Sequence, residues 1–245
     1  MRPESEADYA TPLMTADLVI LSIREGVLHV LLVKRGTEPY LNRYALPGGF
    51  VHHDEQIIAA ARRELQEETG LDDPSMPLEA IGYYDALDRD PRGRVITFSF
   101  LSVTATMPAP YAHRSSDVRI AVWKPVAPML GEDSRLAFDH VAILRDAVYV
   151  ARDRLQYTTL ATRFLPEEFT IAELRAVYEA VWGFELDRAN FHRKVKDARE
   201  FIVETGDVRV GSEGRLGRPA KLYRAGEGSA LVSPILMTLP AGGED

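Results

Sequence analysis

Three glutamates, Glu64, Glu67 and Glu68, lie three and four residues apart in a segment that predicts a helix. That spacing places the three carboxylates on one helix face, one turn apart. Like charges this close destabilise an isolated helix, and a cation between them removes the penalty. Oxygen-only donors suit Mg²⁺, Mn²⁺ or Ca²⁺, and Mg²⁺ readily shares itself with substrate phosphates. The spacing therefore indicates a metal site beside a phosphate pocket, with a solvated acidic face as the alternative.

The helix that carries these glutamates is expected to follow Asp54, a typical N-cap, and to end near Thr69, just before Gly70. Arg63 lies on the same helix and is expected to reach back toward Glu55. This pair would have a structural role outside the carboxylate cluster.

The segment from Gly49 to Leu71 resembles the Nudix box: Gly, five residues, Glu, seven residues, then Arg-Glu-apolar-x-Glu-Glu-x-Gly-apolar. The resemblance implies a strand–loop–helix–loop in which Glu64, Glu67 and Glu68 are catalytic residues that hold Mg²⁺ or Mn²⁺. It also implies attack of water on a diphosphate linked to a second group, usually in a nucleoside diphosphate derivative. Every fixed position is filled, by Gly49, Glu55, Arg63, Glu64, Leu65, Glu67, Glu68, Gly70 and Leu71.

The box does not define the second group or the pocket that would hold it. Arginine suits phosphate through its forked guanidinium, and an aromatic ring can stack on adenine, although a surface arginine or a core aromatic is the alternative for each. Asp117 and Glu38 are alternative general bases, and His52, His53 and His140 are expected to be turn and packing residues. The candidate ligand-binding residues are Arg35, Tyr44, Phe50, Arg89 and Arg94.

The first part of the chain mixes strands and helices. Glu25-Gly26 separates two segments rich in β-branched and apolar residues, which is typical of a hairpin. With the box, this mixture predicts an α+β fold, a Nudix α/β/α sandwich with a mixed sheet. The expected strands are Asp17–Arg24, Val27–Lys34, Ile81–Asp85, Val95–Val103 and Asp117–Trp123, and Phe138–Leu155 has helical periodicity.

The second part of the chain has a different pattern, beginning at Phe164-Leu165-Pro166. A helix is expected with Thr170 as its N-cap and Glu173 as the capping-box partner. A second helix, capped by Asp187 and reaching about Phe201, is followed by two short strands around a Gly-rich loop. Helix, turn, helix and hairpin is the order of a winged helix-turn-helix domain.

Charge is distributed unevenly between these parts. The 245 residues, 46% hydrophobic and 27% charged, are typical of a folded soluble protein, and a net charge of −8 by itself argues against nucleic-acid binding. Residues 186–224, however, hold ten Lys or Arg against six Asp or Glu, a net charge of +4, which leaves −12 for the remainder. Such asymmetry is typical of an acidic domain fused to a basic one.

The second helix of this basic part is amphipathic. Phe191, Val195, Ala198 and Phe201 fall at helical spacing and would face the core. The basic side chains on the other faces suit a DNA groove, where Lys and Arg bind phosphates and a few reach base edges. A solvated basic helix in an enzyme's auxiliary domain is the alternative. The candidate DNA-binding residues are Arg188, His192, Arg193, Lys194, Lys196, Arg215, Arg218 and Lys221.

Several short motifs in this part and in the joining segments carry a second resemblance: Phe169-Thr170, Glu173-Leu174, Tyr178-Glu179, Asn190-Phe191, Arg193-Lys194 and Gly217–Arg224, together with Asp88–Arg94 and Phe138–His140. With these residues, this part resembles the winged-helix domain of the Nudix-related transcriptional regulators of NAD metabolism. The resemblance implies a homodimeric repressor that binds palindromic operator DNA near NAD biosynthesis or salvage genes. ADP-ribose, or a related NAD-derived nucleotide, would bind the Nudix domain and release the DNA.

Three regions are therefore expected: a Nudix domain over 1–155, a winged-helix DNA-binding domain over 156–226 and a flexible tail over 227–245, rich in Gly, Ser, Ala and Pro. The absence of cysteine excludes disulfides and thiolate metal sites and fits a cytoplasmic protein. No apolar run is long enough to span a membrane, and the N-terminus lacks the apolar core of a signal peptide.

Three functions stay open at this point. The first is a DNA-binding regulator whose Nudix domain senses ADP-ribose and, because its box is complete, also retains the residues for hydrolysis. The second is a Mg²⁺-dependent Nudix pyrophosphohydrolase, acting on ADP-ribose or another nucleoside diphosphate derivative, whose tail serves dimerisation or substrate choice. The third is a protein-interaction module that kept its box by descent.

Overall fold

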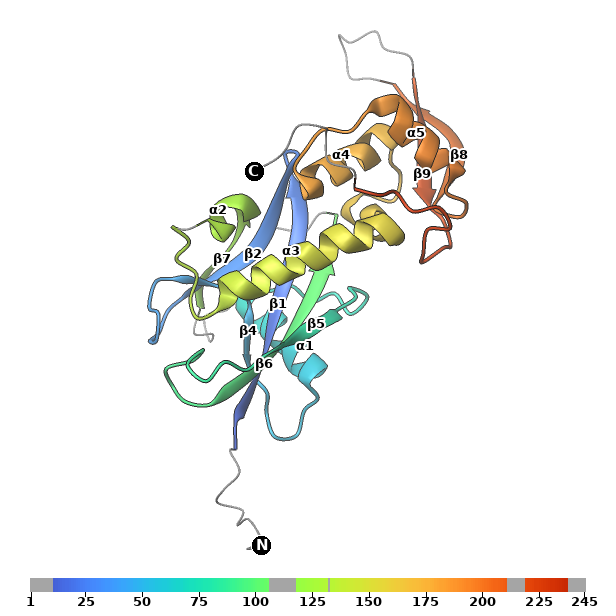
Figure 1. Cartoon of the computed structure of the whole chain (residues 1–245). Coiled ribbons are helices and arrows are strands. Elements are labelled where there is room, and N and C mark those ends of the chain that lie inside the picture. The colour runs from blue at the N-terminus through green and yellow to red at the C-terminus, as the bar shows by residue number, and fades with distance from the viewer. Residues whose placement is uncertain (1–10, 106–117, 132, 211–218, 238–245) are drawn as a thin grey trace, which may run out of the picture. The chain divides into compact units, whose positions relative to one another are not determined.

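The computed structural model describes residues 11–105, 118–131, 133–210 and 219–237 (Figure 1). No helix among them is both long and apolar enough to cross a membrane. The chain divides into a first unit, Met1–Leu21, His29–Ser102 and Met107–Ala147, and a second unit, Ser22–Leu28, Val103–Thr106 and Val148–Asp245. The elements are β1 (Leu13–Arg24), β2 (Val27–Arg35), β3 (Tyr44–Ala45), β4 (Gly48–Phe50), α1 (Ile57–Thr69), β5 (Glu79–Tyr84), β6 (Val95–Val103), β7 (Val118–Pro125), α2 (Val126–Leu130), α3 (His140–Tyr157), η2 (Leu160–Phe164), α4 (Ile171–Trp182), α5 (Arg188–Asp197), β8 (Ile202–Arg209) and β9 (Ala220–Ala225).

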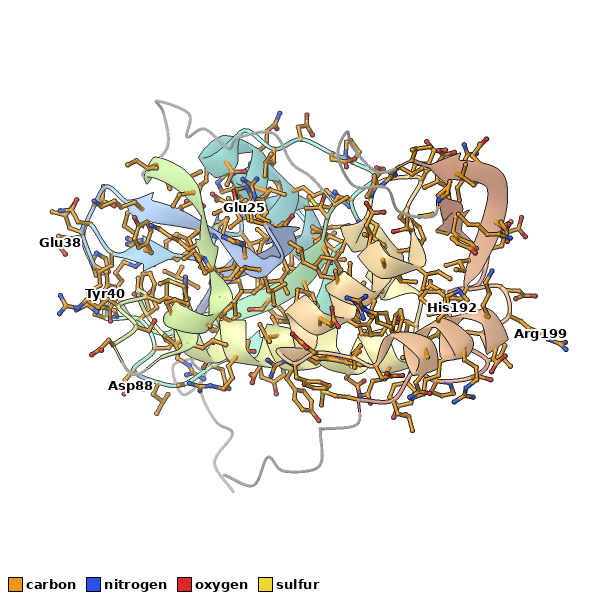
Figure 2. The ribbon with its side chains drawn as sticks, turned by 90° about the horizontal axis from the view of Figure 1, so that it is seen from above. Glu25, Glu38, Tyr40, Asp88, His192 and Arg199 are labelled. Carbon is orange, nitrogen blue, oxygen red and sulfur yellow. The ribbon has the colours of Figure 1, made fainter. Side chains whose placement is uncertain are left out.

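A seven-stranded sheet forms the centre of the first unit. Its strand order is β3-β2-β1-β6-β5, with β4 paired to β1 and β7 paired to β2. Every residue of β1 from Thr15 to Leu21 is buried, as expected for a central strand that is covered on both faces. Figures 1 and 2 show α1 on one face of the sheet and the first half of α3 on the other. This layering confirms the predicted α/β/α sandwich.

Helix α1 packs its small and apolar residues on the sheet and leaves its other side for the glutamates. It begins after Gln56 rather than Asp54, and no side chain caps its first turn. Gly70 ends it as predicted, with a φ of 70°. The buried cluster between helix and sheet includes Ala60, Ala61 and Leu65 of α1 and Leu18, Ile20 and Leu31 of the strands.

The second unit has the predicted helix, turn, helix and hairpin order, formed by α4, α5, β8 and β9. Thr170 and Glu173 form the predicted capping box: the Glu173 N–H donates to Thr170 Oγ1 at 3.1 Å, and the Thr170 N–H donates to Glu173 Oε2 at 2.8 Å. Asp187 caps α5 through its side chain, also as predicted. Local capping signals therefore position both helices of the winged helix.

Helix α5 buries the predicted apolar face but ends earlier than expected. Its last residue is Asp197 rather than Phe201. The helix ends because the backbone of Ala198 is extended, with a φ of −78° and a ψ of 92°. Glu200 then adopts a left-handed φ of 63° just before β8. The four apolar side chains, all at most 4% exposed, are Phe191, Val195, Ala198 and Phe201.

The described part of the C-terminal stretch is held against the end of α3. The backbone N–H groups of Leu231 and Ile235 donate to the carbonyls of Tyr157 and Gln156 at 2.8 and 3.0 Å. Both donor residues are also buried. Residues 227–237 thus differ from the flexible tail that composition predicts, because these two side chains pack into the second unit; residues 238–245 lie outside the described residues.

Candidate functional site

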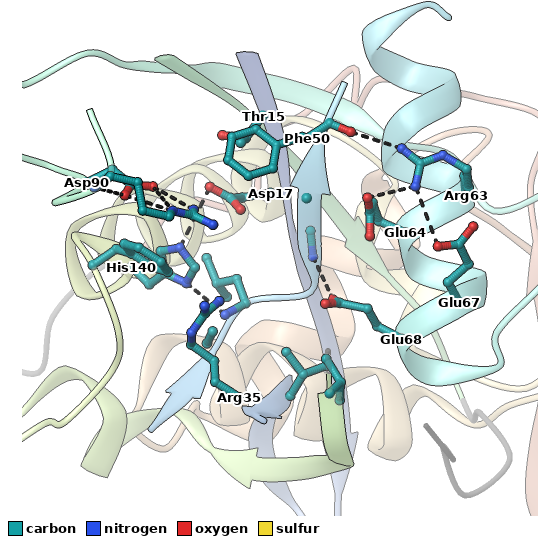
Figure 3. A pocket seen from close by; sticks show the side chains of 18 of the residues that line it. Thr15, Asp17, Arg35, Phe50, Arg63, Glu64, Glu67, Glu68, Asp90 and His140 are labelled. Atoms are coloured by element: carbon teal, nitrogen blue, oxygen red, sulfur yellow. Dashed lines mark hydrogen bonds and ion pairs between the residues drawn. The ribbon is translucent and has the colours of Figure 1, made fainter. Parts of the chain in front are cut away.

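A cavity of about 410 Å³ lies in the first unit, between the ends of β1 and β2, strand β4, helix α1, the loop after β5 and the start of α3. Figure 3 shows two sides to it. The glutamates of α1 and Arg63 lie on one side, which we call the carboxylate side, and Asp90, His140 and Arg35 lie on the other.

Arg63 is the centre of the carboxylate side. Its guanidinium lies 2.7 Å from Glu55, 2.7 Å from Glu64 and 3.6 Å from Glu67, and it donates to the Phe50 carbonyl at 3.0 Å. The predicted pair with Glu55 is confirmed. Hydrogen bonds from Arg63 lower the pKa of Glu55 to about 2, so this ion pair persists well into acid.

The other contacts on this side connect the glutamates with the backbone of β4. Glu68 accepts a hydrogen bond from the Gly48 N–H at 2.8 Å. Glu64 packs on Gly49 so closely that a Cβ there would lie 2.3 Å from Glu64 Oε1. Burial raises the pKa of Glu64 and raises that of Glu68 well above its usual value, because the charged form loses water.

The three predicted metal ligands make separate contacts. Within the described residues, no three His, Asp or Glu side chains converge closely enough to hold a metal ion. Glu64 and Glu67 contact Arg63, and Glu68 contacts Gly48. The donor set nevertheless fits a divalent cation, because all three groups are carboxylates and burial disfavours the charged forms of Glu64 and Glu68, which a cation would stabilise.

Arg89 lies buried on the opposite side of the cavity, between two aspartates. Its guanidinium donates to both oxygens of Asp139 at 2.8 and 2.9 Å and lies 3.6 Å from Asp17. Asp17 also accepts from the Thr97 hydroxyl at 2.7 Å. These bonds satisfy a charge that would be costly to bury alone, and they connect the loop after β5 to β1 and to the start of α3.

Two phenylalanines and two arginines form the aromatic part of the cavity. The guanidinium carbon of Arg92 lies 4.7 Å from the centre of the Phe50 ring and 5.4 Å from that of Phe138. Arg35 lies 5.0 Å from the centre of the Phe138 ring. These distances are within the range of cation–π attraction. Arg92 is held from behind by Asp90, whose carboxylate accepts from the guanidinium at 2.6 Å.

His140, at the first turn of α3, positions the loop that leads to β4. Its Nδ1 accepts the Leu46 N–H at 2.8 Å. Burial lowers the pKa of His140, which favours the neutral ring that this hydrogen bond requires. The sequence predicts a packing role for this residue, and the structure adds this specific contact.

The five predicted ligand-binding residues are divided by the structure. Arg94 donates to the carbonyl of Asp85, and the Tyr44 ring is covered by the Lys124 ammonium at 5.2 Å, so neither lines the cavity. The three that line it are Arg35, Phe50 and Arg89.

Sequence reasoning did not select several of the lining residues. Of the alternative general bases, Glu38 is exposed (Figure 2) and does not line the cavity, and Asp117 lies outside the described residues. Two motif runs noted in the sequence, 88–94 and 138–140, contain most of the residues that were missed. The missed lining residues with charged or aromatic side chains include Asp17, Asp90, Arg92, Phe138 and His140.

Basic side chains cover the exposed faces of α5 in the second unit. Arg188, His192, Arg193 and Lys196 are exposed and Lys194 is partly buried. Arg193 lies 3.8 Å from Asp197. In the part of the chain that the structure describes, Arg188 and Lys194 have no ion-pair partner within 4.0 Å.

Glu204 of β8 pairs with the basic residues next to the hairpin. Lys196 and Lys221 lie 3.6 and 2.6 Å from its carboxylate, which lowers the pKa of Glu204. Lys196 also donates to the Tyr223 hydroxyl at 2.8 Å. Exposed pairs of this kind contribute little stability and can be exchanged for contacts with phosphate. The remaining two predicted DNA-binding residues, Arg215 and Arg218, lie outside the described residues.

Comparisons with known proteins match both units. Residues 12–147 match the NUDIX domain, and residues 161–225 match the NrtR DNA-binding winged helix domain. The chain is 34% identical to the ADPR responsive transcriptional repressor NtrR of Acinetobacter baylyi over 226 residues, which cover 89% of this chain and 84% of that protein.

Two crystal structures of NrtR from Shewanella oneidensis are also similar. The complex with a 27mer DNA superposes with a TM-score of 0.72 at 28% identity and covers 91% of this chain and 99% of that one. The NUDIX domain complexed with ADP ribose superposes with a TM-score of 0.52 at 29% identity and covers 62% and 94%.

Proposed function

Because this chain belongs to the NrtR family of Nudix-related transcriptional regulators, we propose that it is a repressor that binds operator DNA and releases it when ADP-ribose binds. One observation carries the proposal: a single chain joins a cavity of arginines and aromatic rings to a helix with exposed basic side chains. Relatives were crystallised with DNA and, for the NUDIX domain, with ADP ribose.

The cavity has groups for each part of ADP-ribose. Arg35 and Arg92 supply guanidinium groups for a diphosphate, and Phe50 and Phe138 supply rings on which adenine can stack. Mg²⁺ or Mn²⁺ would be held by Glu64, Glu67 and Glu68. When bound, the ion would neutralise these carboxylates and polarise the phosphoryl oxygens.

The DNA is bound by the second unit. Helix α5 enters the major groove, where Arg188, Arg193 and Lys194 contact phosphates and base edges. The β8–β9 hairpin acts as the wing, with Lys221 on it. We also propose a homodimer, because two winged helices related by a twofold axis read the two halves of a palindrome.

Helix α3 is one of the segments that continue from the ligand-binding unit into the DNA-binding unit. His140, its first residue, lines the cavity, and its second half, from Val148, belongs to the second unit. Ligand can shift DNA affinity only by favouring one arrangement of this link over another. A helix that begins in the cavity and continues into the DNA-binding unit provides such a link.

The test is selection of operator DNA by the purified full chain. The protein is incubated with a randomised duplex pool, bound sequences are recovered, and binding is repeated with the non-hydrolysable α,β-methylene analogue of ADP-ribose and Mg²⁺. We expect a palindrome whose binding weakens with rising salt and is lost when the analogue is added. Failure to select any sequence, or an operator insensitive to the analogue, would contradict the proposal.

A second function is favoured by the complete Nudix box and by the carboxylates around the cavity. The chain would hydrolyse ADP-ribose: water adds to one phosphorus, the bridging oxygen leaves, and AMP and ribose 5-phosphate form. With Mg²⁺, Glu67→Gln should reduce turnover by at least about a hundredfold. Arg193→Ala should leave turnover unchanged, because Arg193 lies on the basic helix. No release of AMP by the wild-type chain would exclude this activity.

A further inference from the structure

The loop between β5 and β6 places one arginine, Arg92, in the cavity. Arg92 lines the cavity, and its guanidinium lies over the rings of Phe50 and Phe138, which line it too. The space next to these two rings, which we call the aromatic slot, is therefore filled by a side chain of the protein itself.

Arg92 is held in the aromatic slot by a buried partner. Its backbone N–H donates to Asp90 Oδ1 at 2.9 Å, and its guanidinium donates to the same carboxylate at 2.6, 3.0 and 3.2 Å. The Asp90 side chain is only 2% exposed, whereas that of Arg92 is 37% exposed. The buried Asp90 carboxylate is thus the fixed partner, whereas the partly exposed Arg92 guanidinium can move away from it.

The wall of the aromatic slot is fixed by strained backbone. Phe138 has a φ of 53°, a conformation that a bulky side chain adopts only where its surroundings enforce it. Its ring packs edge-on against Tyr40 at 4.8 Å and lies under Arg35. Such strain is concentrated at ligand clamps and switch regions, and Phe138 stands two residues before α3.

A nucleobase suits the aromatic slot for the same reasons as the guanidinium. Both are flat, and both are attracted to the face of an aromatic ring. A phosphate has no affinity for such a face, but it is an excellent partner for a displaced guanidinium. The residues that would hold a divalent cation, Glu64, Glu67 and Glu68, lie across the cavity on the carboxylate side (Figure 3).

We propose that Arg92 occupies the nucleobase position of the unliganded cavity and makes the site selective for ligands that carry both a base and a phosphate. The inference rests on the proposed ADP-ribose binding and identifies how the ligand is recognised. The base displaces the guanidinium from Phe50 and Phe138, and the guanidinium leaves Asp90 for the phosphate. A ligand that carries only a base gives the displaced guanidinium no phosphate to bind. A ligand that carries only a phosphate has no base to occupy the aromatic slot.

Two partial ligands test this exchange, because Arg92→Ala should change their affinities in opposite directions. Adenosine carries a base and no phosphate, so removing Arg92 opens the aromatic slot and should tighten its binding about tenfold. Ribose 5-phosphate carries no base, so the same variant should weaken its binding about tenfold. Both are measured by calorimetry on the full chain with Mg²⁺. A merely structural role for Arg92 would weaken both.

Two further variants keep the test decisive. Arg92→Lys keeps the positive charge near Asp90 but loses the flat group, so adenosine should still bind more tightly while ribose 5-phosphate is retained. Arg43→Ala is the matched control: it removes an arginine 5.4 Å from the Tyr40 ring, outside the cavity, and should change neither affinity. Thermal unfolding of each variant verifies the fold.

The outcomes separate this inference from the proposed function. Opposite shifts for the two partial ligands in Arg92→Ala, together with tighter adenosine binding and unchanged ribose 5-phosphate binding in Arg92→Lys, support it. Unchanged or jointly weakened binding, in a wild-type chain that binds the ADP-ribose analogue, overturns the role of Arg92 and leaves the proposed function intact. No binding of the analogue by the wild-type chain overturns the proposed function itself.

Discussion

The cavity of the first unit and helix α5 of the second unit use the same residue type in opposite ways. In the cavity, Arg63, Arg89 and Arg92 each contact carboxylates of the same chain. On α5, within the described residues, Arg188 has no such partner and Arg193 lies 3.8 Å from an exposed one. The first set of arginines is oriented in advance, whereas the second remains available to solvent and polyanions.

This difference indicates two kinds of recognition. A paired and partly buried arginine gives up its partner only for a ligand that offers better contacts at the same position, so the cavity selects by shape. An exposed and unpaired arginine attracts any phosphate, and its contribution depends on salt. Sequence selectivity on α5 must then come from the few side chains that reach base edges.

The largest expected effect concerns Gly48 of β4, which lines the cavity, and it tests whether the backbone there tolerates an added side chain. Gly48→Ala should destabilise the first unit by about 4 kcal/mol, because overpacking and backbone strain add. Its Cβ would lie 2.2 Å from the Ala16 carbonyl, and its φ is +154°. The measurement is urea unfolding followed by tryptophan fluorescence in a Trp182→Phe background. The signal then reports on the first unit, because Trp123 is the only tryptophan left.

Gly82→Ala is the matched control for this prediction. Gly82 has the same φ of +154°, but nothing lies within 4 Å of its added Cβ. Backbone strain alone should cost about 1–2 kcal/mol there. Equal losses in the two variants would show that the contact of β4 with β1 is not what constrains the cavity.

The next effect concerns the exposed arginines. Arg193→Ala combined with Lys194→Ala should weaken operator binding about a hundredfold at moderate salt and lower the slope of log affinity against log salt by about 2. Affinity for the ADP-ribose analogue without DNA should not change. Arg43→Ala combined with Arg145→Ala, which removes two exposed arginines of the first unit, serves as the control for net charge. Operator binding that falls equally in both proteins would remove α5 from the interface.

The smallest effect is the pH dependence that His140 contributes. Because burial lowers its pKa below 6.5, the unfolded chain takes up a proton as pH falls while the folded chain resists it. Stability from this group is complete above pH 6.5 and is lost as pH falls toward the folded pKa. His140→Asn keeps an acceptor for Leu46 and should flatten this slope, measured by urea unfolding at several pH values; an unchanged slope would contradict the assignment.

Local spacing explains what could be predicted from the sequence. The i, i+3, i+4 glutamates, the Gly70 and Thr170 caps and the buried face of α5 all follow from contacts within one helix. Helix α5 ends earlier than predicted because the backbone becomes extended at Ala198 and left-handed at Glu200, and neither residue type carries a local signal for these conformations. Helix periodicity cannot reveal where packing turns the chain.

The cavity was only partly predictable because its contacts join distant segments. Arg89 meets Asp139 from 50 positions away, and Phe138 meets Arg92 through the fold alone. Tyr44 and Arg94 have the residue types that suit a nucleotide pocket, but Tyr44 contacts Lys124 and Arg94 contacts Asp85. Residue type indicated what chemistry was available, and only tertiary packing decided which side chains take part.

The most direct test of the central claim is the reciprocity of ligand and DNA binding. Affinity for the α,β-methylene analogue of ADP-ribose is measured with Mg²⁺, first for the chain alone and then with saturating operator DNA. A coupled repressor must bind the analogue more weakly on DNA, by about fivefold or more, and by the same factor with which the analogue weakens operator binding. Equal affinity in the two states would contradict the claim that the Nudix cavity controls the winged helix.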